Sequence, residues 1–375
     1  MDILVVAGEA SGDQHGSELV GELQRRDPSL RFFGMGGRKL SERGVELVYG
    51  AHEVSVMGIV EVLPKLRRIL QVMAGLEGEA KKRKPALAIL IDIPDFNLRL
   101  AAKLKKQGIR VAYYVSPMIW ASRTGRVKQI AKVVDEMLCI LPFEPDFYKV
   151  HGVTARYVGS PVVEQVPAPA STSEFRKRLG VQDRPTLALL PGSRMAEIRR
   201  ILPTMVQAAK ALLAEKGELQ ILVPVAPTIA RQEITSRFEG SGVEPVLIDG
   251  KAPEAVGASD AAIVASGTAA LEAGLMQRPF VVVYRVSWIT YWIARRLLKV
   301  PYVALVNLLA GKRIVPELLQ HEMTAERILT ELRRVWSDGQ ERREMVAELT
   351  KVRESLGPPG AAGRAADAVI ALLKR

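Results

Sequence analysis

The sequence predicts an α/β protein built from two doubly wound domains, each a parallel β-sheet covered by helices. Short apolar runs alternate with amphipathic segments of helical length, and runs such as ALAILI at residues 86–91 are typical of strands buried on both faces. A Pro/Ser/Ala-rich stretch at residues 166–173 interrupts this alternation, which then starts again. The length of 375 residues suits two domains of roughly 150 residues or more.

Each domain is expected to run as strand and helix in turn. We place the first domain at residues 1–165 and the second at residues 174–356, and we expect a helix within residues 357–375 to pack back on the first. Because ligands of open parallel sheets bind at the carboxyl ends of the strands, we expect the domains to face a central cleft. The expected strands are residues 3–7, 31–34, 87–91, 111–115, 136–140 and 155–158, then 186–190, 220–223, 245–248, 261–265 and 279–284.

Composition excludes several classes of protein. Apolar residues make up 48% of the chain and charged residues 25%, which is ordinary for a globular protein and unlike a disordered one. The single cysteine, Cys139, lies in an apolar run and is expected to be a buried, inert thiol. The four histidines form no HExxH pair, so we expect no metal site. No apolar run reaches the roughly 18 residues that span a bilayer, and the start lacks a signal-peptide pattern, so we expect a cytoplasmic location.

The net charge of +12 is concentrated in one part of the chain. Between Lys65 and Lys132 there are sixteen Lys and Arg residues and four Asp and Glu residues, so this stretch carries the whole excess. Such a local field attracts an anionic surface or ligand, although a set of well-solvated helix faces would give the same pattern. Nucleic acid is not the expected partner, because aromatic residues make up only 5% of the chain.

The first motif, GEASGD at residues 8–13, follows the first expected strand and opens a helix. Glycines there let the backbone approach a ligand, and a helix N-terminus offers N–H groups. The motif is neither a GK[ST] phosphate loop nor GxGxxG, and the alternative is a tight turn with Ser11 as the helix cap. The candidate cleft residues are Gly8, Glu9, Ser11, Gly12 and Asp13.

The second motif, LIDIPDFN at residues 90–97, places two carboxylates where a buried strand ends. A carboxylate there can act as a general base, because burial raises its pKa toward a useful value. Asp92 is nearer the strand end and is the better candidate, whereas Asp95 follows a proline and also reads as a helix N-cap.

The third and fourth motifs, LLPGSR at residues 189–194 and ASGTAALE at residues 265–272, each combine small residues with the start of a helix. Such loops suit a diphosphate, and a carboxylate one turn into the helix suits a ribose diol. The alternative for the third motif is a capping box between Ser193 and Glu197, one residue out of register. The candidate binding residues are Ser193, Arg194, Ser266, Gly267, Thr268 and Glu272.

The fifth motif, residues 55–70, places an apolar patch beside the basic stretch, as interfacial elements that bind anionic lipid do. The alternative is a core helix with a basic outer face. A second apolar cluster at residues 288–293, followed by Arg295 and Arg296, has the same character. The candidate membrane residues of the fifth motif are Val56, Met57, Ile59, Val60, Val62, Leu63, Lys65, Arg67 and Arg68.

Together these motifs resemble the lipid-A-disaccharide synthases, glycosyltransferases of GT-B architecture with two Rossmann-like domains. The resemblance covers essentially the whole chain, in order, and eight motifs in series are far more specific than any one. The matching stretches are residues 7–13, 56–63, 91–97, 114–121, 141–148, 189–197, 265–272 and 307–311, with residues 316–320 beyond them.

The resemblance implies the reaction. UDP-2,3-diacylglucosamine would transfer its sugar, with inversion, to 2,3-diacylglucosamine 1-phosphate, giving a tetraacyl disaccharide 1-phosphate and UDP in lipid A biosynthesis. Asp92 would be the base, and Arg194 would be important for activity. Ser11, Glu272 and Asn307 would lie in the ligand cleft. Asn307 would bind the UDP-sugar, and residues 8–13 would be on the acceptor side. No metal or cofactor is implied. The acylated substrates imply a peripheral position on the inner face of the inner membrane, while the oligomeric state, a homodimer included, stays open.

The sequence departs from the family pattern at Ser160, Ser122, Ala304 and Val306, positions that bear on local cleft geometry and acyl preference. Two other functions remain alternatives. One is another GT-B enzyme acting on UDP-N-acetylglucosamine, such as the lipid II transferase or the 2-epimerase, which the matches at residues 91–97 and 56–63 disfavour. The other is a non-catalytic nucleotide- or lipid-binding module, which the presence of Asp92 and Arg194 disfavours.

Overall fold

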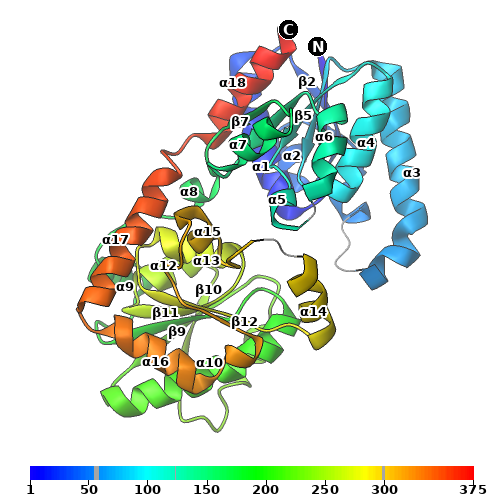
Figure 1. Ribbon diagram of the computed structural model, residues 1–375. Coiled ribbons are helices and arrows are strands. Elements are labelled where there is room, and N and C mark those ends of the chain that lie inside the picture. Colours follow the sequence, from blue (N-terminus) through cyan, green and yellow to red (C-terminus); the bar gives the residue numbers. More distant parts are fainter. Residues whose placement is uncertain (55–58, 123, 298–299) are drawn as a thin grey trace. The chain divides into compact units, whose positions relative to one another are not determined.

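The computed structural model describes residues 1–54, 59–122, 124–297 and 300–375, and within them the chain forms two compact units (Figure 1). The N-terminal unit comprises Met1–Pro161 and Pro358–Arg375, and the C-terminal unit comprises Val162–Gly357. The boundary falls earlier than the predicted end at residue 165, because Val163 and Val166 pack in the core of the C-terminal unit.

The N-terminal unit is built on a parallel sheet with the strand order β3-β2-β1-β4-β5-β6-β7 among the described residues. This order places β1 beside β4, so that Ala7 and Ile91 are register partners at the carboxyl ends of their strands. The predicted strands of this unit are confirmed within a few residues, but β3 was missed because it is a half-exposed edge strand without a continuous apolar run. The strands are β1 (Asp2–Ala7), β2 (Arg31–Gly36), β3 (Glu46–Gly50), β4 (Leu87–Ile91), β5 (Arg110–Tyr114), β6 (Glu136–Cys139) and β7 (Ala155–Tyr157).

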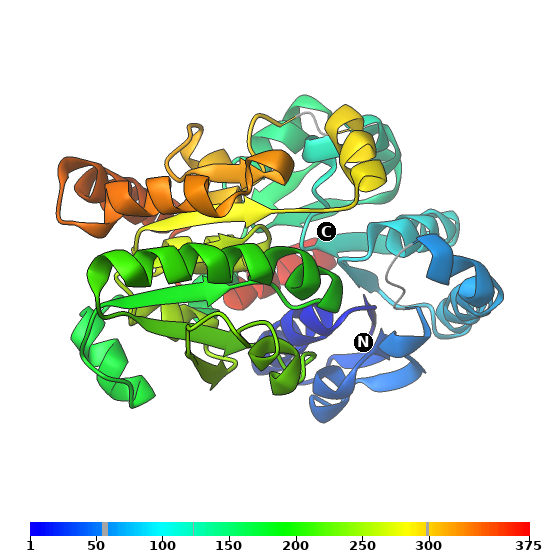
Figure 2. The ribbon, with the colours of Figure 1, turned by 90° about the horizontal axis from the view of Figure 1, so that it is seen from below.

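Helices flank this sheet, and the last helix of the chain is one of them. Helix α18 lies against α1 in both ribbon views (Figures 1 and 2), where Arg26 donates to the Asp367 carboxylate at 2.7 Å and to the Gly363 carbonyl at 2.9 Å. Buried alanines such as Ala365 and Ala366 let the helix approach closely. The helices are α1 (Ala10–Arg26), α2 (Arg38–Glu42), α3 (Ile59–Arg83), α4 (Pro94–Lys106), α5 (Ile119–Ser122), α6 (Val127–Val133), α7 (Glu144–Val150) and α18 (Ala361–Leu373).

The C-terminal unit repeats the design with the parallel strand order β10-β9-β8-β11-β12-β13 among the described residues. Its predicted strands are confirmed, except that the short edge strand β13 was missed. Both sheets therefore confirm the prediction of doubly wound α/β domains. The strands are β8 (Thr186–Leu190), β9 (Gln220–Val225), β10 (Pro245–Asp249), β11 (Ala261–Ala265), β12 (Phe280–Tyr284) and β13 (Glu317–Leu319).

The helices of the C-terminal unit cover both faces of its sheet, which gives the core two apolar clusters. They are α8 (Val162–Gln165), α9 (Thr172–Leu179), α10 (Met195–Lys216), α11 (Arg231–Thr235), α12 (Ala252–Gly257), α13 (Thr268–Leu275), α14 (Trp288–Leu297), α15 (Leu305–Ala310), α16 (Ala325–Trp336) and α17 (Gln340–Ser355).

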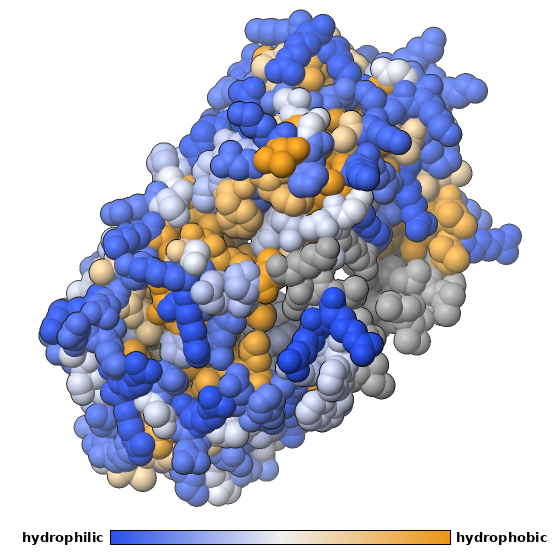
Figure 3. All heavy atoms as spheres, viewed as in Figure 1, coloured by the Kyte–Doolittle hydropathy of each residue, from blue (hydrophilic) through white to orange (hydrophobic). Residues whose placement is uncertain are grey.

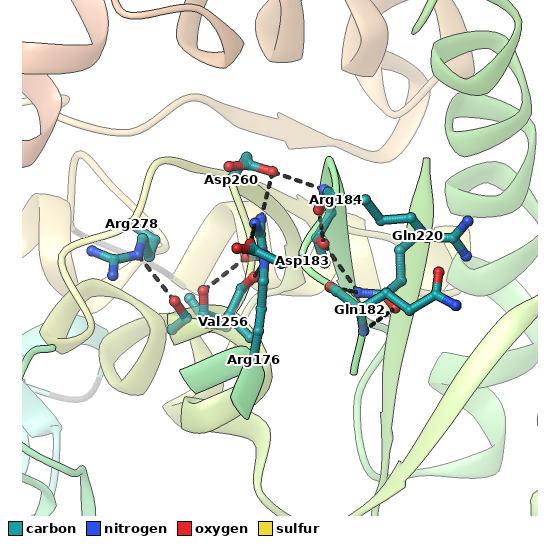
Figure 4. A network of polar contacts seen from close by, with 12 residues as sticks. Arg176, Gln182, Asp183, Arg184, Gln220, Val256, Asp260 and Arg278 are labelled. Atoms are coloured by element: carbon teal, nitrogen blue, oxygen red, sulfur yellow. Dashed lines mark hydrogen bonds and ion pairs between the residues drawn. The ribbon is translucent and has the colours of Figure 1, made fainter. Parts of the chain in front are cut away.

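A buried arginine, Arg176, connects helix α9 to the sheet of this unit through hydrogen bonds (Figure 4). Arg176 of α9 donates to Asp183 at 2.6 Å, to Asp260 at 2.9 Å and to the Ala258 carbonyl at 3.0 Å. Asp260 also accepts the N–H of Thr186 at 2.7 Å. The starts of β8 and β11 are thereby fixed at the end of the sheet away from the strands' carboxyl ends.

Candidate active site

The first and second motifs lie together at the carboxyl ends of β1 and β4. Gly8 follows β1 directly, and a Cβ atom added there would lie 2.4 Å from Cδ1 of Ile93, which follows β4. A larger residue at this position would require the Ile93 side chain to move. The structure therefore brings residues 8–13 next to the turn that carries Asp92.

Within the first motif the predicted residues differ in what they contact. The Asp13 carboxylate accepts the N–H groups of Gly37 at 2.7 Å, Lys39 at 3.0 Å and Leu40 at 3.2 Å, so it holds the N-terminus of α2. Ser11 is exposed in the first turn of α1. Its alternative interpretation as the helix cap is wrong, because α1 begins at Ala10 and Glu9 occupies the N-cap position.

Asp92 lies in a strained turn. Its φ is 53° and that of Ile93 is 37°, so two consecutive L-residues adopt the left-handed region that usually requires glycine. Burial raises the pKa of Asp92, while a hydrogen bond from the Ile93 N–H and the nearby His15 act in the opposite direction. A carboxylate with a raised pKa at a strand end has the property that a general base needs.

Asp95 is exposed and forms an ion pair with Arg126. The interpretation of Asp95 as an N-cap is wrong, because α4 begins at Pro94 and Ile93 occupies the N-cap position. Proline is favoured at the first helical position, since its φ is already helical and it needs no N–H partner there.

An apolar cavity of about 400 Å³ opens beside the Asp92 turn. Leu66, Ile69, Leu70 and Met73 of α3 form one wall, and the residues that follow β4 form another. Three charged residues also line it, namely Glu9, Asp95 and Arg99. We call this space the apolar cavity. Its lining suits a hydrocarbon chain attached to an anionic group.

The third and fourth motifs meet at a second cavity of about 610 Å³ in the C-terminal unit, here called the two-loop cavity. Residues 190–194 and 265–269 line it together with Glu197, Glu272 and Tyr284. All predicted UDP-sugar residues from the two motifs are therefore among its lining residues. Sequence reasoning missed Tyr284 and residues 224–227 and 250–253. Their places at or just beyond the carboxyl ends of β9, β10 and β12 were a usable signal.

The loop of the third motif is held by its own helix. Glu197 accepts the N–H groups of Ser193 at 3.1 Å and Arg194 at 3.3 Å, and Gly192 before them has a φ of 109°. The capping interaction considered for Glu197 is therefore present, with Arg194 rather than Ser193 at the N-cap position. The Arg194 side chain is 64% exposed, with Nη1 3.8 Å from Glu197 Oε1, so its guanidinium is accessible to a ligand.

The loop of the fourth motif starts helix α13. Gly267 is its N-cap residue with a φ of 146°, a conformation that favours glycine. Ser266 and Thr268 flank it, and Glu272 lies one turn into the helix. Burial raises the pKa of Glu272. A carboxyl group in this position can accept hydrogen bonds from a sugar hydroxyl.

Asn307 is not among the lining residues of the two-loop cavity. Its amide is fully buried and forms hydrogen bonds with the backbone of Ile314 and Val315 and with the Glu317 carboxylate. These contacts tie α15 to the segment before β13. A contact between Asn307 and the UDP-sugar therefore stays a prediction.

A buried carboxyl group joins two further stretches of the family pattern. Glu144 accepts hydrogen bonds from the indole N–H of Trp120 at 3.0 Å and from the N–H of Leu141 at 3.0 Å. Burial raises the pKa of Glu144. The departures from the pattern at Ser160, Ala304 and Val306 are buried as well, so their first effect is on packing, while Ser122 ends α5.

The predicted membrane residues lie at the start of α3. Val56 and Met57 lie outside the described residues, and for Ile59, Val60, Val62, Leu63 and Lys65 only the helical backbone is described. Further along α3, Arg67 and Arg68 are exposed next to the exposed Leu66 and Leu70. Figure 3 shows hydrophobic and hydrophilic surface side by side on this face of the N-terminal unit.

A second exposed apolar surface lies on α14. Trp288 is 63% exposed and Trp292, one turn further, is 52% exposed, with Arg295 and Arg296 exposed beyond them. No helix in the part of the chain that the structure describes is long and apolar enough to cross a membrane.

Solved structures of other proteins identify the fold. The chain superposes over its whole length on a UDP-N-acetylglucosamine 2-epimerase from Listeria monocytogenes, with a TM-score of 0.63, 12% identity and 95% of that chain covered. It superposes similarly on the calicheamicin glycosyltransferase CalG4, with a TM-score of 0.63, 13% identity and 100% and 98% of the two chains covered. The fold is thus that of GT-B glycosyltransferases and related epimerases.

The sequence comparisons then specify the family. The model of the lipid-A-disaccharide synthetase family matches residues 3–367. The lipid-A-disaccharide synthase of Myxococcus xanthus is 67% identical over 372 residues, which cover 99% of this chain and 97% of the relative, and that of Anaeromyxobacter dehalogenans is 51% identical over 374 residues, with 99% and 97% covered. The chain belongs to the lipid-A-disaccharide synthase family, which confirms the resemblance found in the sequence and makes it a glycosyltransferase of lipid A synthesis.

Proposed function

We propose that the chain transfers the sugar of UDP-2,3-diacylglucosamine to 2,3-diacylglucosamine 1-phosphate, which yields a tetraacyl disaccharide 1-phosphate and UDP. The observation that supports acylated substrates is the apolar cavity beside the Asp92 turn. An unacylated sugar has no apolar chain that could pack against the four apolar side chains of its α3 wall. Arg99 at the same cavity suits an anionic group of the acylated substrate.

Asp92 is the base of this reaction. The 6-hydroxyl oxygen of the acceptor forms a bond to the anomeric carbon as the bond from that carbon to the diphosphate oxygen breaks. The hydroxyl proton passes to the Asp92 carboxylate, and the bonding electron pair leaves with UDP. This single displacement inverts the anomeric configuration and requires one base.

The two-loop cavity binds the UDP part of the donor. Arg194 and the N-termini of α10 and α13 stabilise the charge that develops on the leaving diphosphate. Ser193, Ser266, Gly267 and Thr268 supply hydrogen-bond donors to its oxygens, and Glu272 accepts from the ribose hydroxyls. The chemistry requires no metal ion, since a guanidinium and two helix N-termini face the same cavity.

The enzyme works at the surface of an anionic membrane, which we propose is the inner face of the inner membrane. Both substrates carry acyl chains that favour a bilayer. The exposed leucines and arginines of α3 and the exposed tryptophans and arginines of α14 support this proposal, because such side chains suit the lipid–water interface.

Acylated and unacylated donors should differ strongly as substrates. Mass spectrometry of the products should show a tetraacyl disaccharide 1-phosphate with the acylated donor. Unacylated UDP-N-acetylglucosamine should be turned over with a kcat/KM lower by about 100-fold or more, because each buried methylene contributes about 0.8 kcal/mol. Equal kcat/KM for both donors, or a 2-epimer as the product, would contradict the proposal.

Membrane association should have a salt-sensitive and a salt-resistant part. We expect partial sedimentation with phosphatidylglycerol vesicles at low salt and a reduced fraction at 1 M salt, where the Debye length is only about 3 Å. The double variant Leu66→Ser/Leu70→Ser should lose much of the fraction that survives high salt. Val150→Ser is the control, because Val150 is 83% exposed elsewhere in the N-terminal unit. Equal sedimentation of the double variant and the control would count against α3 as a membrane contact.

A further inference from the structure

The Asp92 turn needs support from its surroundings. Asp92 and Ile93 both adopt left-handed backbone conformations, and for a β-branched residue such as Ile93 this is a strained state. Conformations of this kind persist only where neighbouring groups hold them. The contacts of the Asp92 backbone N–H and carbonyl groups therefore determine where its carboxylate lies.

The carbonyl oxygen of Asp92 is held by side chains of two elements. It accepts a hydrogen bond from Tyr113 Oη of β5 at 2.5 Å and another from Asn97 Nδ2 of α4 at 2.8 Å. Tyr113 is the register partner of Leu90 on the adjacent strand, and the Asp92 N–H donates to the carbonyl of the next β5 residue, Tyr114, at 3.2 Å. Strand β5 thus holds both the N–H and the carbonyl group of Asp92.

The two donors differ in what else they do. Asn97 Nδ2 also donates to the Ile91 carbonyl at 3.1 Å, and the Asn97 N–H donates to the Ile93 carbonyl at 3.0 Å, so its side chain also supports the start of α4. The Tyr113 hydroxyl donates to the Asp92 carbonyl and also interacts with the Asn97 side chain, so the two donors lie together at this carbonyl. Tyr113 is fully buried, and burial raises the pKa of its hydroxyl well above the usual value, so the group stays a donor.

We propose that Tyr113 is a positioning residue for the transfer reaction, whose buried hydroxyl holds the Asp92 carbonyl and thereby orients the carboxylate toward the acceptor hydroxyl. This rests on the proposed role of Asp92 as the base. Tyr113 acts through Asp92 and does not itself contact the substrate. Its contribution is to the geometry of proton transfer, which is sensitive to displacements of about 1 Å.

The test is the variant Tyr113→Phe in the full-length enzyme, assayed with acylated donor and acceptor. It keeps the buried ring and removes one oxygen atom. We expect kcat to fall by about tenfold while the KM of the donor changes by less than about twofold, because the donor's UDP part binds in the other unit. In an Asp92→Asn background, the same substitution should lower kcat no further, because it acts through the carboxylate.

Tyr148→Phe is the matched control. Tyr148 is also fully buried in the N-terminal unit, and its hydroxyl also donates to a backbone carbonyl, that of Pro117, at 3.2 Å. The two variants should lower Tm by similar amounts, yet only Tyr113→Phe should lower kcat. The Tm comparison separates a lost hydrogen bond of the fold from a displaced carboxylate.

Each other outcome decides against the proposal. A parent-like kcat in Tyr113→Phe, an equal loss of kcat in both tyrosine variants, or a further tenfold loss in the Asp92→Asn background would overturn the positioning role. If any of these results is found while Asp92→Asn strongly lowers kcat, the proposed role of Asp92 as the base still holds and only the role of Tyr113 is wrong. If Asp92→Asn itself turns over like the parent, both the base and the positioning role are wrong.

Discussion

Replacing Asp92 by asparagine is expected to lower kcat by about 10²–10⁴-fold while UDP remains bound with unchanged affinity. The amide has nearly the same shape as the carboxylate but cannot accept the proton of the acceptor hydroxyl. The measurement is steady-state turnover with acylated substrates, together with UDP binding by calorimetry. Near-normal turnover would remove Asp92 from the mechanism and direct attention to Glu9, which lines the apolar cavity beside the Asp92 turn.

Asp367→Asn is the control, because Asp367 is an exposed carboxylate of the same unit that pairs with Arg26, away from the apolar cavity. It should leave kcat within about threefold of the parent. The pH profile gives a second check. Burial raises the pKa of Asp92, and the base must be ionised, so activity should fall on acidification at a pH above the ordinary aspartate range. An acidic limb that persists in Asp92→Asn would assign it to another group.

Replacing Arg194 by alanine is expected to lower kcat by about 10²-fold. The side chain is 64% exposed in the two-loop cavity, and the charge it would stabilise appears only as UDP departs, so the effect should be on kcat more than on KM. The measurement is steady-state kinetics with acylated donor and acceptor.

Arg199→Ala is the control for this substitution, because Arg199 is an exposed arginine on the same helix. It should retain parental kcat. Activity of the parent should also survive EDTA, since the proposed stabilisation of the diphosphate comes from the protein. Loss of activity in EDTA that magnesium restores would contradict the role given to Arg194 and the two helix N-termini.

The sequence predicted those parts of the molecule that depend on neighbours along the chain. Continuous apolar runs indicated the central strands, because a strand buried on both faces must be apolar throughout. Small residues and glycines at strand ends indicated the loops of the two-loop cavity, and position alone singled out Asp92. These features are local in sequence, so periodicity and motif reasoning could find them.

The tertiary structure decided the features that depend on distant partners. The Asp13 carboxylate holds a helix that begins 25 residues later, and the Asn307 amide forms hydrogen bonds with residues 314–317. The motif around each residue therefore could not indicate its partner. The edge strands β3 and β13 take their strand conformation from pairing with β2 and β12 rather than from an apolar pattern of their own. Tyr113 lies in the strand predicted at residues 111–115, and nothing in its local sequence indicates a partner for its hydroxyl. Its hydroxyl acquires a role only because parallel pairing places β5 beside β4, where a strained turn needs a hydrogen-bond donor.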